Sequence, residues 1–460
     1  MKKTVLFLMN GFGVEQLDSY SIYNAKLMPN LDRYTKEYLF SSIETPASNL
    51  VSGYRCFSTG SLYPLSYSLI DNYLDKFAEN KNFELYLNSI NENGKIHIFL
   101  SFENDKSVDH LKSFLKFIRS KKTNPIFLHL VLIGNNTSDY KTIERLINKV
   151  IYDIKECKIG IVVGKNILSY ANVSSFMNLF QNEVGEKWRE ISRKISSLTS
   201  LKTIPANARE FYMNEGFKLD VNDSIFFFNY EYIDLTNLVM AISKVINNDN
   251  FFSMFSVKGV KYPMFAYPKS GISMLNSLDK IGAKALIVSN RGSMGVINYY
   301  CCGLQNIVSD RISFVKTDNL NFEQLKAIIR DSDYSLVIIS YQIDDVKTVP
   351  ELNDRLSRLD KMLGYIHDFC VSGGYSLFIS SLYGMQKELA VDNFVKATVN
   401  FSHKVPFVVI DPVFNKANFS LGIGNIYNLA HTIYTNINNK YDGGEVLIRR
   451  KSFIVKLLRK

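Results

Sequence analysis

The side chains that could do chemistry lie directly after short apolar runs with the character of buried β-strands. Asn10 follows the first run, Lys165 follows one near the middle of the chain, and Asp345 follows one in the last third. Sheets of parallel strands bind ligands at the carboxyl ends of their strands. Carboxylates there can ligate manganese or zinc together with histidine, and lysine or arginine can bind phosphate. The segments to consider are residues 10–13, 134–137, 164–166, 229–234, 290–295, 340–348 and 381–385.

Strand-like and helix-like stretches alternate along the whole chain. Amphipathic helical patterns separate the apolar runs, and this alternation predicts an α/β fold with parallel sheets covered by helices on both faces. The expected strands are residues 5–9, 96–100, 127–133, 159–163, 224–229, 285–289, 335–339 and 376–380, and the clearest helices are residues 108–120, 141–156, 322–330 and 352–371.

Length and composition are those of a globular protein. The chain has 460 residues, 46% of them hydrophobic and 21% charged, so it is long enough for two domains and is not disordered. It has no run of about 18 apolar residues, so no membrane span is expected. The apolar start runs into Asn10-Gly-Phe-Gly13 instead of a signal-peptide cleavage site. Five cysteines without metal-like spacing favour a reducing, cytoplasmic location.

Positive charge is spread thinly except at the C-terminus. A net charge of +10 over the whole chain argues against dedicated nucleic-acid binding. In residues 449–460, however, six basic residues alternate with five apolar ones. This basic C-terminal tail is either a final strand or helix with a solvated face, or a docking segment for a partner or an acidic surface.

Several segments match the motifs of one protein family, in the same order along the chain. The first strand ends in Asn10-Gly-Phe-Gly13 where that family has Asp-Gly-Trp-Gly. Further along, Phe227-Phe-Asn-Tyr230 resembles Phe-Phe-Asn-Phe, and Ser309-Asp-Arg-Ile312 resembles Glu-Asp-Arg-Ile. Val405-Pro-Phe407 matches Val-Pro-Phe. The chain therefore resembles the cofactor-independent phosphoglycerate mutases of the alkaline phosphatase superfamily.

This resemblance implies a two-domain organisation. Residues 1–74 and 266–460 would form an alkaline-phosphatase-like parallel-sheet domain. Residues 75–265 would form a second, inserted α/β domain that is transferase-like. The two junctions are expected near Leu74 and Phe265.

The resemblance also implies a set of catalytic positions, most of which are changed here. Active members move a phosphoryl group through a phosphoserine and use two divalent metal ions, usually manganese, to hold the phosphate oxygens. Ser52 stands at the nucleophile position and Asp345 at one metal-ligand position. The other ligand positions lack the family's carboxylates and imidazoles, and they hold Asn10, Val349, Leu382, Tyr383 and Asn400.

The substrate positions are altered as well. Active members bind an anionic substrate with several arginines, because their donor forks match phosphate and carboxylate. Here Lys165 retains one positive charge. The remaining positions hold Asp105, Asn135, Glu231, Asp234 and Gly292. Acidic groups at such contacts repel an anionic ligand, so glycerate phosphate is not expected to bind.

Losing both sites together favours a phosphoglycerate-mutase-like pseudoenzyme that is a structural or regulatory subunit of a protein assembly. No metal cofactor is then expected, and the partner would be a protein that contacts the basic tail. One alternative is residual metal-dependent phosphotransfer by Ser52 and Asp345; another is an anion or nucleic-acid binding module. The retained residues also have plain structural explanations: Ser52 as a turn or cap residue, Asp345 as a solvated or helix-capping residue, and Lys165 as a surface lysine.

Overall fold

The structure is a computed structural model of the whole chain. It describes residues 1–14, 25–47, 50–60, 70–71, 73–102, 105–132, 145, 148–149, 152, 157–164, 173–182, 186–187, 211–212, 216–230, 235–246, 251–257, 259–265, 273–290, 294, 297–298, 301, 309–316, 322–330, 333–343, 348–389, 395–402, 404–439 and 445–451.

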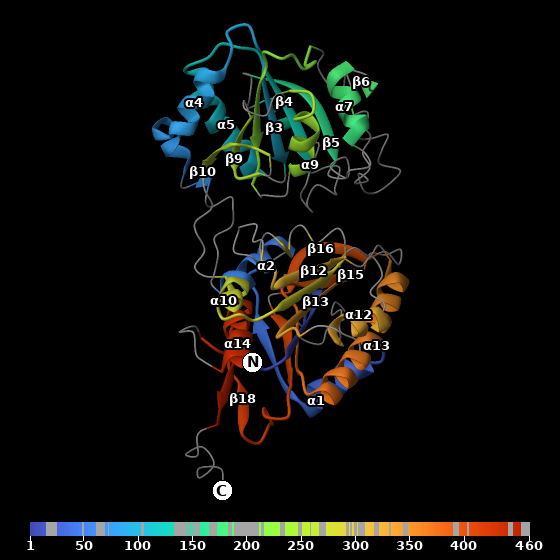
Figure 1. Cartoon of the computed structure of the whole chain (residues 1–460). Coiled ribbons are helices and arrows are strands. Elements are labelled where there is room, and N and C mark those ends of the chain that lie inside the picture. Colours follow the sequence, from blue (N-terminus) through green and yellow to red (C-terminus); the bar gives the residue numbers. More distant parts are fainter. Residues whose placement is uncertain are drawn as a thin grey trace. The chain divides into compact units, whose positions relative to one another are not determined.

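The chain folds into two compact units (Figure 1). Met1–Tyr63 and Lys269–Lys460 form the terminal unit, and Pro64–Pro268 form the inserted unit. These boundaries compare with the junctions expected near Leu74 and Phe265. The 3-10 helix η1, Leu74–Glu79, belongs to the inserted unit, where its Phe77 packs against Phe83 and Phe114.

The terminal unit is built on a mixed sheet with the strand order β12-β11-β13-β1-β14-β17-β2. The strands from β12 to β14 are mutually parallel, and β17 is antiparallel to both of its neighbours. The sheet is thus parallel in its core, as the sequence predicts, but not throughout. The bounds are β1 Thr4–Phe12, β2 Leu39–Glu44, β11 Ala285–Ser289, β12 Ile312–Lys316, β13 Leu336–Gln342, β14 Ser376–Ser380 and β17 Lys404–Ile410.

Shorter strands extend this unit. β15 (Gly384–Leu389) pairs with the end of β1 and with β16 (Val395–Ser402). β18 (Phe419–Leu421) and β19 (Ile448–Arg450) form a separate antiparallel ribbon. The expected basic tail therefore begins inside a strand, because Arg449 and Arg450 belong to β19, and residues 452–460 lie outside the described part of the chain.

The helices of the terminal unit have sequence signals at their ends. The long helix α13 begins after Thr348, whose side chain accepts the Glu351 N–H, and ends at Gly374, which adopts a left-handed φ of 70°. In Figure 1, α13 (orange) lies beside α1 (blue), although they are distant in sequence. The bounds are α1 Pro29–Glu37, α2 Leu50–Thr59, α10 Met274–Lys280, α12 Phe322–Arg330, α13 Val349–Gly373 and α14 Ile426–Asn438.

The inserted unit has a sheet of its own, ordered β10-β9-β8-β3-β4-β5-β7-β6. The strands from β10 to β5 are parallel, whereas β7 is antiparallel to β5. The bounds are β3 Ile96–Phe102, β4 Ile126–Leu132, β5 Lys158–Gly164, β6 Glu186–Lys187, β7 Phe211–Tyr212, β8 Ser224–Phe228, β9 Phe251–Phe255, β10 Tyr262–Phe265, α4 Lys81–Ser89, α5 Asp105–Arg119, α7 Val173–Asn182 and α9 Thr236–Ile242.

The α/β fold class is confirmed, and all the strands expected from the sequence are present within a few residues. Three of the four expected helices correspond to α5, α12 and α13. The fourth, at residues 141–156, falls mostly outside the described residues. None of the helices in the described ranges combines the length and apolar character needed to cross a bilayer.

Candidate functional site

The candidate site lies where the central strands of the terminal unit end. The parallel register pairs Asn10 of β1 with Gln342 of β13, and Leu8 of β1 with Ser380 of β14. Asn10, the end of β13 and the turn after β14 therefore come together at one edge of the sheet, as expected for parallel strands. The Ile343 N–H donates to the Asn10 carbonyl at 3.1 Å, which fixes the neighbouring strand ends.

Asn10 is fully buried and uses both ends of its side-chain amide. Its Nδ2 donates to Ser340 Oγ at 3.0 Å, and its Oδ1 accepts the Leu382 backbone N–H at 3.3 Å. A buried polar group needs such partners because an unsatisfied one is costly. Asn10 is therefore a structural link between three strand ends, and its oxygen points to a backbone amide.

Leu382 fills the space beside Asn10. Its side chain is completely buried, and its Cβ approaches the helix α2 so closely that a Cβ added at Gly53 would lie 2.8 Å away. Only a glycine permits this contact without displacement. Ser52, the expected nucleophile position, precedes this glycine and is 9% exposed. The expected nucleophile position is thus next to a glycine that packs against the buried, apolar side chain of Leu382.

Hydrogen bonds hold the turn that carries Leu382. Thr45 Oγ1 donates to the Leu382 carbonyl at 2.7 Å, and Ser381 Oγ donates to the Tyr383 carbonyl at 2.6 Å. The Gly11 N–H also donates to the Tyr383 carbonyl at 3.1 Å. Tyr383 is buried like Leu382. The turn therefore buries two large side chains, while the carbonyls of both residues accept hydrogen bonds.

A tyrosine completes the buried cluster. The Tyr54 hydroxyl lies beside Ser340 and Asn10 and makes no hydrogen bond of good geometry with a described residue. Burial raises the pKa of this phenol far above its usual value, and Cys301 adds to the rise, while Ser340 and Asn10 oppose it. Tyr54 is therefore a neutral phenol at physiological pH.

These residues do not fit a pair of divalent metal ions. Such ions need several carboxylate oxygens and imidazoles around an open volume. The described part of this edge offers one amide already bonded to protein, a leucine, two tyrosines and serine hydroxyls such as those of Ser52 and Ser340. No group of three or more His, Cys, Asp or Glu side chains among the described residues has the arrangement of a metal site. Val349, at another expected ligand position, is the first residue of α13.

The structure describes only part of the predicted site. Asp345 and Lys165 lie outside the described residues, as do Asn135, Glu231, Asp234 and Gly292. The backbones of Asp105 and Asn400 are described, in α5 and β16, but their side chains are not. Among the sequence-predicted positions, the structure therefore brings together Asn10, Ser52, Leu382 and Tyr383.

Sequence reasoning did not single out Thr45 or Tyr54. It did include Ser340, as the first residue of the segment 340–348 that follows an apolar run, and the structure places this serine near the end of β13. Tyr54 lies two residues after Ser52, but nothing in the sequence indicates that its hydroxyl is buried beside Asn10.

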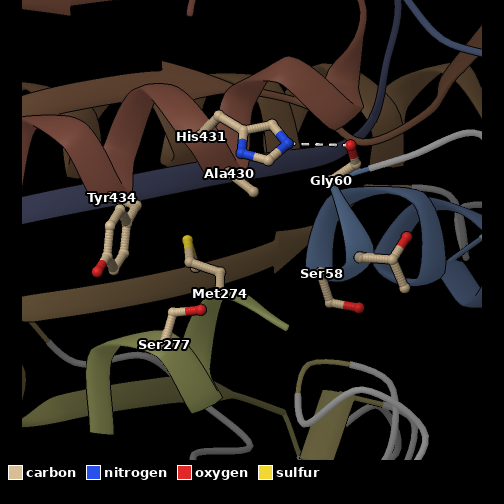
Figure 2. A pocket seen from close by; sticks show the side chains of 8 residues that line it. Ser58, Gly60, Met274, Ser277, Ala430, His431 and Tyr434 are labelled. Carbon is tan, nitrogen blue, oxygen red and sulfur yellow. Dashed lines mark hydrogen bonds between the residues drawn. The ribbon is translucent and has the colours of Figure 1, made fainter. Parts of the chain in front are cut away.

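A small cavity lies elsewhere in the terminal unit, between α2, α10 and α14. Figure 2 shows Ser58 and Gly60 facing Met274, Ser277, His431 and Tyr434, with the His431 Nε2 at 3.1 Å from the Gly60 carbonyl. Its volume is about 20 Å³, which is room for about one water molecule. It is too small for a phosphorylated sugar acid.

Comparison with known proteins establishes the fold. No protein-family model and no curated protein matches the sequence. A phosphoglycerate mutase from Leishmania mexicana, determined at low cobalt concentration, matches 98% of each chain with a TM-score of 0.80 and 13% sequence identity. This chain has the fold of a phosphoglycerate mutase.

Two other solved structures match less closely. An alkaline phosphatase from the Antarctic bacterium TAB5 covers 95% of this chain and 97% of its own, at 11% identity and a TM-score of 0.30. The lipoteichoic acid synthase LtaP from Listeria monocytogenes covers 38% of this chain and 54% of its own, at 14% identity and a TM-score of 0.27.

The inserted unit contains a second group of titratable residues at its strand ends. His110 of α5 lies with Nε2 at 2.7 Å from Asp71 Oδ1 and with Nδ1 at 3.0 Å from the Tyr230 hydroxyl. Since the carboxylate accepts from Nε2–H, Nδ1 accepts from the phenol. Burial lowers the pKa of His110, and Asp71 opposes this. Tyr230 is 1% exposed, so this chain of bonds is suited to holding the strand end in place.

Two further histidines lie in the strands of the same unit. His97 and His129 are fully buried and hydrogen-bonded to each other at 3.0 Å. They are therefore core residues of the inserted unit.

Proposed function

We propose that this chain is a phosphoglycerate-mutase-like pseudoenzyme, a non-catalytic structural or regulatory subunit of a protein assembly. The observation that carries the proposal is the burial of Leu382 against Gly53. An apolar side chain takes the place where the resemblance implies a carboxylate ligand, and it is fixed there by the hydrogen bond from its N–H to Asn10. On this proposal, no divalent metal cofactor is required.

The chemistry of the surrounding groups supports the same conclusion. A phosphoryl transfer needs an exposed nucleophile and positive charge around the transferred group. Ser52 is instead almost buried, and the Leu382 side chain packs against the next residue, Gly53. Arg55 in the same helix carries a positive charge but is buried itself. A phosphate dianion at Ser52 would have to be desolvated against the apolar Leu382, which is strongly unfavourable.

The competing proposal is residual metal-dependent phosphotransfer by Ser52 and Asp345. It is favoured by one observation, that Ser52 lies in the first turn of α2 next to the Leu382 turn. The test is an assay of 2- and 3-phosphoglycerate interconversion and of phosphatase turnover with added manganese. The purified chain is compared with Ser52→Ala. We expect no turnover in either protein, and turnover that Ser52→Ala abolishes would overturn the pseudoenzyme proposal.

Membership of an assembly has its own test. Native mass spectrometry of the protein isolated gently from its source should show a complex of defined stoichiometry with another protein, in the cytoplasmic fraction. Consistent recovery of the free monomer would contradict the subunit role. A third candidate, an anion or nucleic-acid binding module, predicts a measurable slope of affinity against salt.

A further inference from the structure

The ribbon formed by β18 and β19 carries an unusual combination of exposed side chains. We define the basic ribbon as these two strands with the flanking Lys416, Ile423 and Lys451. Ile423 is 88% exposed, the highest value among the large exposed apolar side chains of the described residues. An aliphatic side chain has no hydrogen bonds to water to give up. Its transfer from water to an apolar environment is therefore favourable in free energy.

Basic side chains lie immediately beside this isoleucine. The Arg449 side chain passes over Gly422, so closely that a Cβ added there would lie 2.8 Å from its Nε. The antiparallel register pairs Leu421 with Ile448, Ser420 with Arg449 and Phe419 with Arg450. Ile423 and Arg449 therefore belong to one continuous surface.

The opposite end of the ribbon adds two lysines. The Lys451 N–H donates to the Asn418 carbonyl at 2.8 Å, and its Nζ donates to the Lys416 carbonyl at 2.5 Å. Lys416 Nζ in turn donates to the Lys36 carbonyl. Both ammonium groups are thus held by backbone carbonyls, which leaves their positive charge uncompensated by these contacts.

Acidic groups near the ribbon only partly offset these cations. Glu445 pairs with Arg449 at 2.8 Å, and Glu44 lies at the end of the neighbouring β2, where its N–H donates to the Gly424 carbonyl. Among the described residues, four exposed cations, Lys416, Arg449, Arg450 and Lys451, stand against these two carboxylates and Glu37, which follows Lys36. The sequence that follows, residues 452–460, adds three more cations, five large apolar residues and no acid.

We propose that the basic ribbon is a docking surface for an anionic lipid bilayer. Cations close to the surface of such a bilayer are attracted by its negative potential, and a protruding aliphatic side chain can enter the headgroup region. Cations alone, or one apolar side chain alone, would bind a membrane only marginally. The proposal therefore rests on the combination of positive charge with an exposed apolar side chain. An acidic polymer without an apolar phase would give Ile423 nothing to bury against.

The test uses the full chain in flotation with vesicles of phosphatidylcholine mixed with phosphatidylglycerol, compared with vesicles of phosphatidylcholine alone. We expect binding to the anionic vesicles only, weakening as salt is raised. The double variant Arg450→Glu/Lys451→Glu should bind at least about 25-fold more weakly, since each cation contributes roughly fivefold. The matched control is Lys284→Glu/Lys361→Glu, which reverses two exposed lysines of the same unit and should bind like the parent.

The variant Ile423→Ser distinguishes binding to a lipid bilayer from binding to other anionic partners. It leaves the charge unchanged and alters a side chain that is almost fully exposed, so the fold is retained, and we expect about tenfold weaker vesicle binding. Polyglutamate serves as a probe for an acidic protein surface. The proposal is overturned if neutral vesicles bind equally well, if Ile423→Ser binds like the parent, or if polyglutamate competes fully for the ribbon. It does not depend on loss of catalysis, because a catalytically active chain could carry the same surface.

Discussion

Two buried regions, one in each unit, handle polar groups in opposite ways. At the strand ends of the terminal unit, Asn10 and the Leu382 turn pair neutral groups with one another and fill the remaining space with apolar side chains. In the inserted unit, a chain of ionisable groups is fully buried: the Ile161 N–H donates to His129 Nδ1, so His129 Nε2–H donates to His97 Nδ1, and His97 Nε2–H donates to Asp223.

This difference indicates which of the two regions should change its stability with pH or with added metal. The neutral cluster in the terminal unit has no group that titrates near neutral pH, and it offers no open ligand shell. The inserted unit instead depends on two imidazoles that stay neutral. Burial lowers the pKa of His129 well below its ordinary value, and it lowers the pKa of His97 less because Asp223 opposes the effect. We therefore expect the terminal unit to be insensitive to metal and the inserted unit to be sensitive to acid.

The largest expected effect is on the terminal unit. Leu382→Asp would bury an unpaired carboxylate at a site with 0% exposure, and it should lower the free energy of unfolding by about 4 kcal/mol. The matched variant Leu382→Met keeps an apolar side chain of similar volume and should cost less than about 1.5 kcal/mol. Urea denaturation measures both. If added manganese raised the stability of the parent protein, the region would be a metal site and the comparison would fail.

A fall in pH should destabilise the inserted unit. The two histidines have folded pKa values below the unfolded value of about 6.5, so their stabilising contribution is present above that value and is lost as the pH falls below it. Lowering the pH from about 7.5 to about 5.5 should remove roughly 2 kcal/mol. Hydrogen exchange of the β3 and β4 amides, compared with amides of β1, measures the loss.

His129→Leu is the control for this pH effect. It should be less stable at every pH, because it leaves the Ile161 N–H and the His97 Nδ1 without their partner, but its stability should depend less on pH. Equal pH dependence in the parent and in His129→Leu would show that other groups carry the effect.

A smaller effect is expected at the contact between α2 and the Leu382 turn. Gly53→Ala adds a methyl group 2.8 Å from Leu382 Cβ, and the overpacking outweighs the gain in helix propensity by about 1 kcal/mol. In a double-mutant cycle, Leu382→Gly, which removes the Cβ that the added methyl group meets, should make the Gly53→Ala change neutral or favourable. Strict additivity of the two changes would mean that they do not touch.

Helices and strands could be predicted from the sequence where the residues that determine them are close together in the chain. Apolar runs such as those of β1 and β14 identify buried strands, and the Thr348 cap with Gly374 predicts the ends of α13. The resemblance also implied a ligand position at Leu382, and the apolar character of this residue can be read from the sequence without coordinates. Tertiary pairings were not: the use of Asn10 as a link between Ser340 and Leu382, and the chain from His129 to Asp223, depend on strand register. A final strand was one of the alternatives for the basic tail, but its pairing with β18, about 30 residues earlier in the chain, could not be predicted.

The most direct test of the central claim is thermal unfolding of the full chain with added manganese and with a chelator. A protein that binds metal only when folded is stabilised by several kcal/mol, roughly 2.7 at a metal concentration 100 times the dissociation constant. We predict the same transition temperature in both conditions, because Leu382 and Asn10 already close the site. A saturable rise in transition temperature with manganese that is absent in Asn10→Leu would contradict the account.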